Sequence, residues 1–333
     1  MNFKVLIIAE AGVNHNGNFD LALKLIDEAK EAGADAVKFQ TAVPELVMTN
    51  SADMAKYQVT NTGQKTSQLE MSKKIHLPLG DYKKLKKYCD NKKIMFLSTP
   101  FDHRSIEELN KLNMEYFKIP SGEITNLPYL THVAKLANKI ILSTGMSNMK
   151  EVDSALKVLY KNGVKKDNIT LLHATTDYPT NMSDVNLKAM ISMQNKFDIK
   201  VGYSDHTRGI EIPIAAVALG AICIEKHFTL DRRLEGPDHK ASLEPIELQN
   251  MVKAIRNIEI ALGDGKKQPA KGEMQNINIA RRSIVAKTRI KKGDILNENN
   301  LIVKRPGNGI NPMNWYKIIG SVAKKNYDED DLI

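Results

Sequence analysis

Short runs of apolar residues alternate with amphipathic stretches along most of the chain, from residue 4 to about residue 262. Residues 5–10 are typical of a buried strand, and in residues 21–29 the apolar positions recur on one face of a helix. The same alternation predicts eight strands, most of them followed by a helical pattern. The strands are expected near residues 5–10, 36–40, 94–99, 116–119, 140–144, 169–173, 200–204 and 222–227.

Continuous apolar strands joined by crossover helices indicate a parallel sheet of the α/β class. Eight such units in about 250 residues fit a closed (β/α)8 barrel, the TIM-barrel fold. An open doubly wound sheet is the alternative, but no Gly-x-Gly-x-x-Gly follows the first strand. The connection over residues 42–76 is unusually long, which is typical of a lid, a substrate-binding excursion or a partly disordered segment.

The composition changes near residue 265, which predicts a domain boundary. Residues 1–265 would form the barrel, and residues 266–281, polar with Pro and Gly, would form a linker. Residues 282–333 contain short strand and turn patterns and would form a second, small domain. Since about fifty residues bury only a small core, we expect this domain to dock on the barrel of the same subunit or of a partner.

Composition and charge narrow the class of protein. With 42% hydrophobic and 26% charged residues, the chain is typical of a globular protein. It has neither an apolar stretch long enough to cross a membrane nor the basic start of a signal peptide, which predicts a cytoplasmic location. Cys89 and Cys223 fall in a predicted helix and a predicted core strand, which favours reduced thiols over disulfides. The net charge is +9, but lysines such as those in residues 83–87 are not interleaved with aromatics, which favours a solvated surface over a nucleic-acid or membrane partner.

Polar side chains close the predicted strands, where barrel enzymes place their catalytic groups. They are Glu10, Lys38, Gln40, Ser98, Thr99, Lys118, Ser121, Ser143, Thr144, His173, Thr176, Ser204, His206, Glu225 and His227. Lys38 and Lys118 lie among apolar neighbours, where an unpaired ammonium is costly, so they predict an anionic ligand. Together with the hydroxyl groups, they favour a phosphorylated or carboxylated small molecule.

His206 and His227 end neighbouring predicted strands, an arrangement that favours a divalent metal with open water positions, with Glu10 across the mouth. A site with few protein ligands and no thiolate favours Mn, or Mg as the alternative, over structural Zn. Asp238 and His239 follow the eighth strand on a turn-rich loop, where they would either hold sugar hydroxyls or cap the loop.

Nine short motifs follow one another along the chain. They are EAGVNHNG (10–17), VKFQT (37–41), STPF (98–101), FKIPSGE (117–123), LSTGM (142–146), YSDH (203–206), EKHF (225–228), GPD (236–238) and KRPGNG (304–309). In this order they resemble the sialic acid synthase family, the bacterial nonulosonate synthases. The resemblance covers essentially the whole chain, including a C-terminal domain similar to the antifreeze-like or SAF domain.

The resemblance implies an N-acetylneuraminate synthase, a metal-dependent transferase that condenses phosphoenolpyruvate with N-acetylmannosamine to a nine-carbon 2-keto sugar acid and phosphate. The alternative is N,N'-diacetyllegionaminate synthase, which uses 2,4-diacetamido-2,4,6-trideoxymannose, because the loop over residues 235–240 resembles a branch that holds both activities. A rival within enzymes is another phosphoenolpyruvate aldol synthase, which usually lacks the C-terminal domain. A non-catalytic sugar-binding barrel is the alternative from another class.

The resemblance also implies roles for individual residues. Phosphoenolpyruvate would be held by Lys38, Thr99, Lys118, Ser121, Ser143 and Ser204; the metal by His206 and His227; the sugar by Gln40, Tyr178, Asp238 and Arg305; and Glu10 and Glu225 would be catalytic. In the family, Arg305 reaches the sugar from the C-terminal domain of the partner subunit, which implies a domain-swapped homodimer. The chain departs from the family after the sixth strand, where Thr176 stands in place of a longer amide side chain.

Overall fold

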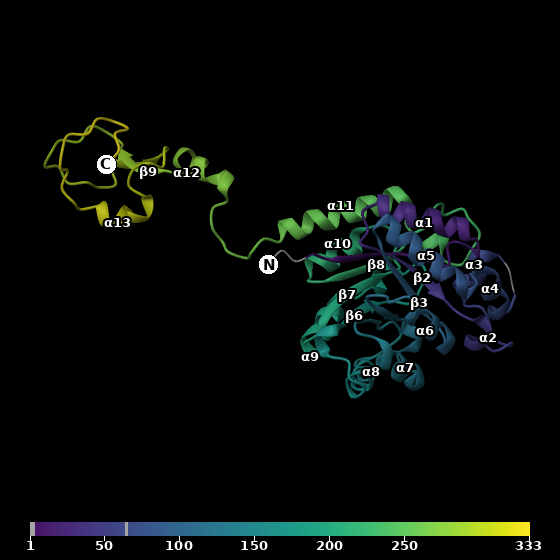
Figure 1. Ribbon diagram of the computed structural model, residues 1–333. Helices are drawn as coiled ribbons and strands as arrows, with labels where there is room; N and C mark the ends of the chain where they lie inside the picture. Colours follow the sequence, from purple (N-terminus) through teal and green to yellow (C-terminus); the bar gives the residue numbers. More distant parts are fainter. Residues whose placement is uncertain (1–3, 64–65) are drawn as a thin grey trace. The chain divides into compact units, whose positions relative to one another are not determined.

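The computed structural model describes residues 4–63 and 66–333, and it divides into two compact units, Met1–Gly263 and Asp264–Ile333 (Figure 1). In the first unit eight parallel strands pair in the order β3-β2-β1-β8-β7-β6-β5-β4. Strands β3 and β4, at the two ends of this order, contact each other, so the barrel is nearly closed. The strands are β1 (Leu6–Gly12), β2 (Ala36–Thr41), β3 (Met95–Pro100), β4 (Phe117–Ile119), β5 (Ile140–Ser143), β6 (Ile169–Ala174), β7 (Lys200–Asp205) and β8 (Cys223–His227). The predicted (β/α)8 barrel is confirmed.

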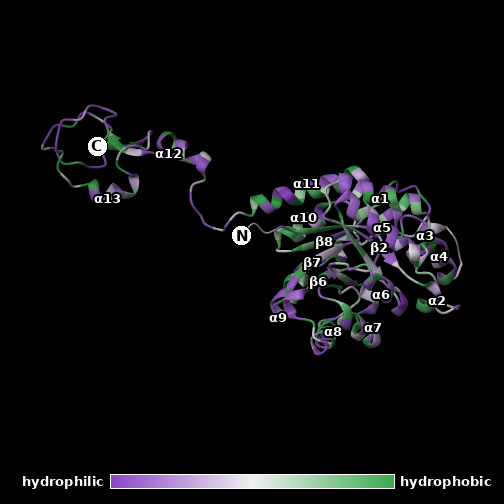
Figure 2. Ribbon diagram, viewed as in Figure 1, coloured by the Kyte–Doolittle hydropathy of each residue, from purple (hydrophilic) through white to green (hydrophobic). Residues whose placement is uncertain are grey.

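Amphipathic helices surround the strands. They are α1 (Phe19–Glu31), α5 (Leu79–Lys92), α6 (His103–Asn110), α7 (Leu127–Leu136), α8 (Met149–Lys161), α9 (Lys188–Phe197), α10 (Glu211–Ala218) and α11 (Pro245–Ala261). Local sequence explains where they start. At α8, the Asn148 side chain accepts from the backbone N–H of Glu151, and the Glu151 carboxylate accepts from the N–H of Asn148, a capping box. Figure 2 shows apolar strands inside and mixed polar and apolar helices outside.

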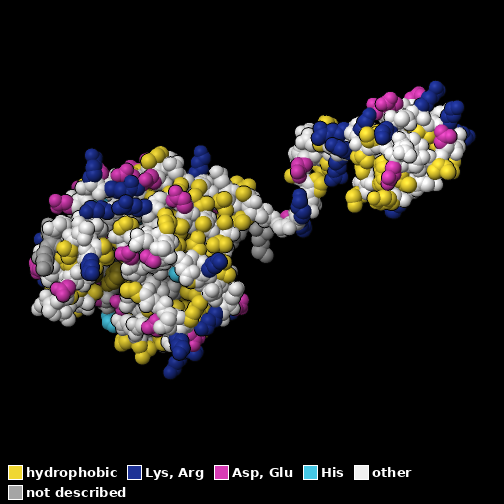
Figure 3. Space-filling view, turned by 180° about the vertical axis from the view of Figure 1, so that it is seen from behind, with side chains coloured by type: hydrophobic (Ala, Val, Ile, Leu, Met, Phe, Trp, Pro, Cys, Tyr) yellow, Lys and Arg dark blue, Asp and Glu magenta, His cyan; other side chains and the backbone are white. Residues whose placement is uncertain are grey.

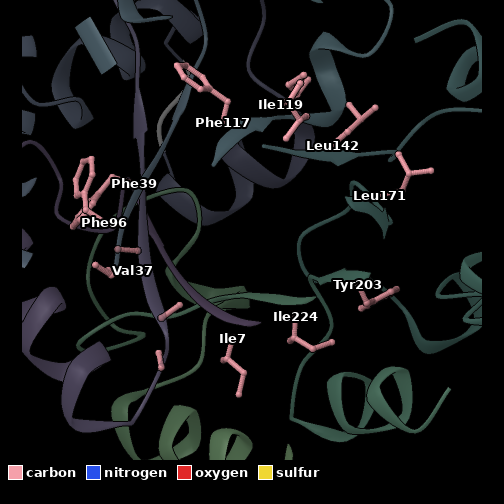
Figure 4. Packing of buried hydrophobic residues seen from close by; sticks show 14 of the residues in the cluster. Ile7, Val37, Phe39, Phe96, Phe117, Ile119, Leu142, Leu171, Tyr203 and Ile224 are labelled. Atoms are coloured by element: carbon pink, nitrogen blue, oxygen red, sulfur yellow. The ribbon is translucent and has the colours of Figure 1, made fainter. Parts of the chain in front are cut away.

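Apolar residues along the barrel strands alternate between two buried clusters. Residues such as Ile7, Val37 and Ile224 belong to the large cluster that fills the space between strands and helices (Figure 4). Their neighbours in sequence, such as Ile8, form a second cluster inside the barrel. Because successive side chains of a strand point to opposite faces, the residue two positions after each interior apolar residue also points inward. This places Glu10 above Ile8 in the barrel interior.

The long connection between β2 and α5 carries three short helices over its described part; residues 64–65 lie outside the described residues. The helices are α2 (Pro44–Val47), α3 (Lys56–Thr62) and α4 (Gln68–Ile75). The Asn61 side chain in α3 donates to the carbonyl oxygen of Pro237 at 2.7 Å, and Lys240 donates to the carbonyl oxygen of Thr60 at 3.2 Å. These contacts tie the connection to the loop after β8. We call residues 42–76 the excursion.

The second unit has its own small core. The antiparallel strands β9 (Ser283–Ala286) and β10 (Leu301–Lys304) pair in it, and α12 (Met274–Ala280) and α13 (Trp315–Ile318) are its α-helices. Ile284, Leu301 and Tyr327 belong to its buried apolar cluster. Its residues therefore bury an apolar centre of their own.

The two cysteines are as expected from the sequence. Cys89 and Cys223 are buried free thiols, as predicted, and burial raises the pKa of Cys89 to about 12. Within the described residues, none of the helices has the length and apolar character that crossing a membrane requires. On the face in Figure 3, Lys and Arg are interspersed with acidic and uncharged residues over the first unit.

Candidate active site

A cavity of about 300 Å³ opens at the carboxyl ends of the barrel strands. Its lining brings together every first-unit residue to which the resemblance assigns a role. These are Glu10, Lys38, Gln40, Thr99, Lys118, Ser121, Ser143, Tyr178, Ser204, His206, Glu225, His227 and Asp238. The strand-end candidates Ser98, Thr144 and His173, in contrast, are not part of the lining. Strand alternation explains the convergence of the lining residues in the strands, because a residue such as Lys38 stands two positions beyond an interior residue, Ala36. Tyr178 and Asp238 come from loops.

Barrel closure corrects one expectation. Glu10 was expected across the mouth from the two histidines, but β1 pairs with β8, so Glu10 stands in register with His227. The error comes from treating the first and last strands as distant, whereas a closed barrel makes them neighbours. Glu10 therefore belongs to the histidine side of the cavity.

Two lysines and two glutamates form a buried network at the floor of the cavity. The Lys38 ammonium lies 2.8 Å from Glu10 Oε2 and 3.7 Å from Glu225 Oε2. The Lys118 ammonium lies 3.8 Å from Glu225 Oε1. All four side chains are at most 7% exposed, so their charges are screened little by water.

The network sets the protonation of its members. Burial raises the pKa of Glu10 to about 7, with Lys38 opposing the rise. Burial alone would raise the pKa of Glu225, but the nearby Lys118 and Lys38 outweigh it and hold that pKa below its usual value. Burial lowers the pKa of Lys118, whereas for Lys38 the two carboxylates outweigh burial and raise the pKa. The two carboxyl groups thus differ in basicity, the property that separates acid and base roles.

Hydroxyl groups surround the lysines. Lys118 donates to Ser143 Oγ at 2.7 Å, and Lys38 donates to Thr99 Oγ1 at 3.0 Å. On the same side, the Gly145 backbone N–H donates to Ser121 Oγ at 2.9 Å. Gly145 has no room for a Cβ, which would stand 2.3 Å from Thr176 Oγ1, so Thr176 lies beside this group. Cations and hydroxyls at one end of a cavity suit a phosphate or carboxylate.

The two histidines are arranged as metal ligands would be. The Nδ1–H of His206 donates to the Thr175 carbonyl oxygen at 2.7 Å, which leaves the Nε2 lone pair available. His227 Nδ1 is buried without a hydrogen-bond partner. Burial lowers the pKa of both rings, His227 more strongly because His206 also opposes its charge, so both imidazoles are neutral. The ring centroids are 5.5 Å apart. These residues fit a divalent metal.

The metal site would be open. Among residues 4–63 and 66–333, no group of three or more His, Cys, Asp or Glu side chains is placed to hold a metal. Two protein ligands would leave the other coordination positions to water and substrate, as in catalytic rather than structural metal sites.

Aromatic rings and one acid form the wall beside the histidines. The Tyr178 ring centroid lies 4.2 Å from that of His206 and 5.7 Å from that of His227. Asp238 is buried and lines the cavity, and burial raises its pKa to about 6. Its side chain makes no capping hydrogen bond. His239, in contrast, is fully buried, with Nδ1 2.7 Å from Thr229 Oγ1, and it supports the loop.

Arg305 belongs to the second unit. Its side chain is exposed, and its Nε–H donates to the carbonyl oxygen of Ala280 at 3.1 Å. Arg305 is not among the residues that line the cavity in the first unit.

The cavity also contains residues that the sequence did not single out. Tyr57 in α3 stacks on Tyr178 with ring centroids 4.9 Å apart. Val13, Met71 and Ile75 contribute apolar wall. Val13 lies within the first motif, but neither strand alternation nor a motif marks Tyr57, Met71 and Ile75, because they come from the short helices of the excursion.

A second buried ion pair supports the histidines from outside the cavity. Lys226 and Asp205 are both fully buried, and the ammonium lies 2.5 Å from Asp205 Oδ2. Lys226 also donates to the Thr207 carbonyl oxygen, and the Thr207 hydroxyl donates to Asp205 at 3.0 Å. This cluster holds the turn that contains His206.

Comparisons with known proteins agree with this geometry. The NeuB family matches residues 25–267, and the SAF domain matches residues 281–333. A protein of Campylobacter jejuni named N,N'-diacetyllegionaminic acid synthase is 56% identical over 330 residues, 99% of both chains. A Legionella pneumophila protein of the same name is 45% identical over 96% of this chain and 90% of its own. The crystal structure of N-acetylneuraminic acid (sialic acid) synthetase from Leptospira borgpetersenii, in complex with citrate, is 37% identical with a TM-score of 0.71, covering 83% of this chain and 91% of that one.

Proposed function

The chain belongs to the NeuB family, and on that premise we propose that it is an N,N'-diacetyllegionaminate synthase. It condenses phosphoenolpyruvate with 2,4-diacetamido-2,4,6-trideoxymannose to give a nine-carbon 2-keto acid and phosphate. The sequence motifs put N-acetylneuraminate synthase first and this activity second. The order is reversed here, because identity is 56% with the Campylobacter legionaminic acid synthase and 37% with the Leptospira sialic acid synthetase.

One observation carries the chemistry: a single cavity joins an anion-binding end to a pair of neutral histidines. At the anion-binding end, Lys38 and Lys118 bind the phosphate and carboxylate of phosphoenolpyruvate, and the surrounding hydroxyls donate to the same oxygens. At the other end, His206 and His227 would hold a divalent metal, Mn or Mg. That metal, when bound, supplies Lewis-acid polarisation of the sugar aldehyde.

The protein residues position the partners and handle the protons. The methylene carbon of phosphoenolpyruvate bonds to the aldehyde carbon, water adds at the carbon that carries phosphate, and the bond from that carbon to the phosphate oxygen breaks. Glu10 stands in register with His227 and, with its pKa near 7, suits proton transfer to and from the aldehyde oxygen. Glu225, held ionised by Lys118, suits the role of base toward the attacking water.

Sugar recognition would involve both units. Gln40, Tyr178 and Asp238 contact the sugar from the barrel. Arg305 would reach the 2-acetamido group from the small domain of the partner subunit, in a domain-swapped homodimer.

The test is the dependence of phosphate release on both substrates. Purified protein with Mn should release phosphate from phosphoenolpyruvate only when the diacetamido sugar is present, one phosphate per nine-carbon acid. Phosphate release from phosphoenolpyruvate alone would refute a synthase. Binding of the sugar without turnover would refute it as well and would favour a non-catalytic sugar-binding barrel.

A further inference from the structure

The cavity has walls of two kinds. The strand ends and the loops that follow them contribute the charged groups and most of the hydroxyl groups, whereas the excursion contributes a separate wall, half of whose residues are apolar. The apolar members from the excursion are Ala42, Val47, Met48, Met71 and Ile75, and Val13 at the end of β1 joins them. The reaction described above uses none of these residues.

This second wall carries no charge among the described residues. Its polar members are uncharged, such as Tyr57, Gln58 and Gln68. Burial lowers the pKa of the wall's histidine, His76, which favours the neutral ring. In α4, Lys73 is 42% exposed and pairs with Glu45, 3.1 Å away.

Contacts place this wall on the sugar side of the cavity. The Gly17 backbone N–H donates to the Ile75 carbonyl oxygen at 3.0 Å, which holds the end of α4 above β1, the neighbour of the His227 strand. In α3, Tyr57 stacks on Tyr178, which in turn packs on His206. Both ends of this wall thus lie near the histidines, where the proposed function places the aldehyde.

We propose that the excursion is the specificity element for the distal end of the sugar, with Met71, Ile75 and Val13 as the wall against its 6-deoxy methyl and 4-acetamido groups. The proposal rests on the proposed function, which places the aldehyde at the histidines and phosphoenolpyruvate at the lysines. The sugar chain then runs away from the lysines, and its carbons 4 to 6 meet the excursion. A methyl group gains from contact with these three apolar side chains, whereas a hydroxyl packed against them loses hydration.

The same wall disfavours a sugar phosphorylated at carbon 6. A phosphate there would be buried against uncharged side chains, without the cation that a desolvated dianion requires. We therefore expect kcat/KM to be highest for the 6-deoxy diacetamido sugar, lower for N-acetylmannosamine and lowest for N-acetylmannosamine 6-phosphate.

Met71→Gln tests the proposal, because it keeps the length of a wall residue that is 8% exposed and replaces its thioether by an amide. For this variant, kcat/KM for the diacetamido sugar should fall by about 10-fold or more, while kcat/KM for N-acetylmannosamine should change less than about 3-fold. Met54→Gln is the matched control, since Met54 lies in the excursion but outside the cavity lining. It should change neither value, and Met71→Leu should retain the wild-type preference. The KM for phosphoenolpyruvate should stay constant throughout.

The outcomes separate the two claims. If the wild-type protein prefers N-acetylmannosamine, the proposed function fails and the inference fails with it. If the wild-type protein prefers the diacetamido sugar but Met71→Gln retains the same ratio of kcat/KM values, the excursion is not the specificity element. An equal shift in the ratio for Met54→Gln would contradict the inference in the same way.

Discussion

The Lys226–Asp205 pair offers a sharp test of how the barrel holds its histidines. Both side chains have no exposure, and the ammonium also donates to the carbonyl oxygen of Thr207. Lys226→Met removes the cation and leaves the Asp205 carboxylate buried, its remaining side-chain donor being the Thr207 hydroxyl. Breaking a buried pair in this way costs about 3 to 5 kcal/mol. For a barrel of this size we expect the melting temperature to fall by roughly 6 to 20 °C.

A double-mutant cycle separates the pair from simple loss of packing. Adding Asp205→Asn to Lys226→Met removes the orphaned charge, so the double variant should be more stable than the sum of the single losses predicts, by about 1 to 3 kcal/mol. Urea unfolding followed by fluorescence gives the free energies of unfolding. As a control, Lys86→Met breaks the exposed Lys86–Asp90 pair in α5, and it should cost less than about 1 kcal/mol.

The cycle would refute the reasoning if the two single losses added to within about 0.5 kcal/mol, because the carboxylate and ammonium would then be independent. A loss for Lys226→Met no larger than that for Lys86→Met would contradict it as well. Since the pair holds the turn around His206, Lys226→Met should also raise the Mn concentration needed for half-maximal activity, by roughly 10-fold.

Three further predictions concern the substrates and the metal. Lys118→Met loses the contact with Ser143 and should lower kcat/KM for phosphoenolpyruvate by about 100-fold, measured from initial rates. The value of kcat/KM for the sugar should fall less. Unchanged phosphoenolpyruvate kinetics would show that Lys118 is not part of the anion site. Arg305→Ala should raise the KM for the sugar about 10-fold more than the KM for phosphoenolpyruvate, and an equal rise in both would count against the swapped-domain assignment. Chelation should abolish phosphate release, and added Mn or Mg should restore it. The variant His227→Gln should prevent that recovery, whereas the control His132→Gln, which lies outside the cavity, should not. Activity that survives chelation would exclude the metal role.

The barrel was predictable because its signal is local and repeated. Each apolar run is followed by an amphipathic helix, and the eight runs appear in the structure as eight parallel strands. The polar layer was predictable for the same reason, since a residue such as Glu225 stands two positions beyond the interior Cys223.

Features that depend on closure or on long-range packing were not predictable. The position of Glu10 beside His227 follows from the pairing of the first strand with the last, which no local pattern encodes. Asp238 and His239 are adjacent in sequence, yet one lines the cavity and the other is packed under the loop. Tyr57 lies in a helix too short to show periodicity, so its stacking on Tyr178 becomes visible only in the folded chain.

The central claim is the identity of the sugar, and direct competition tests it most directly. Equal concentrations of 2,4-diacetamido-2,4,6-trideoxymannose and N-acetylmannosamine would be incubated with limiting phosphoenolpyruvate and Mn, and the nine-carbon products quantified by mass spectrometry. The account predicts that the product with the mass of N,N'-diacetyllegionaminic acid predominates by at least about 10-fold. Predominance of N-acetylneuraminic acid, or release of phosphate without either acid, would contradict it.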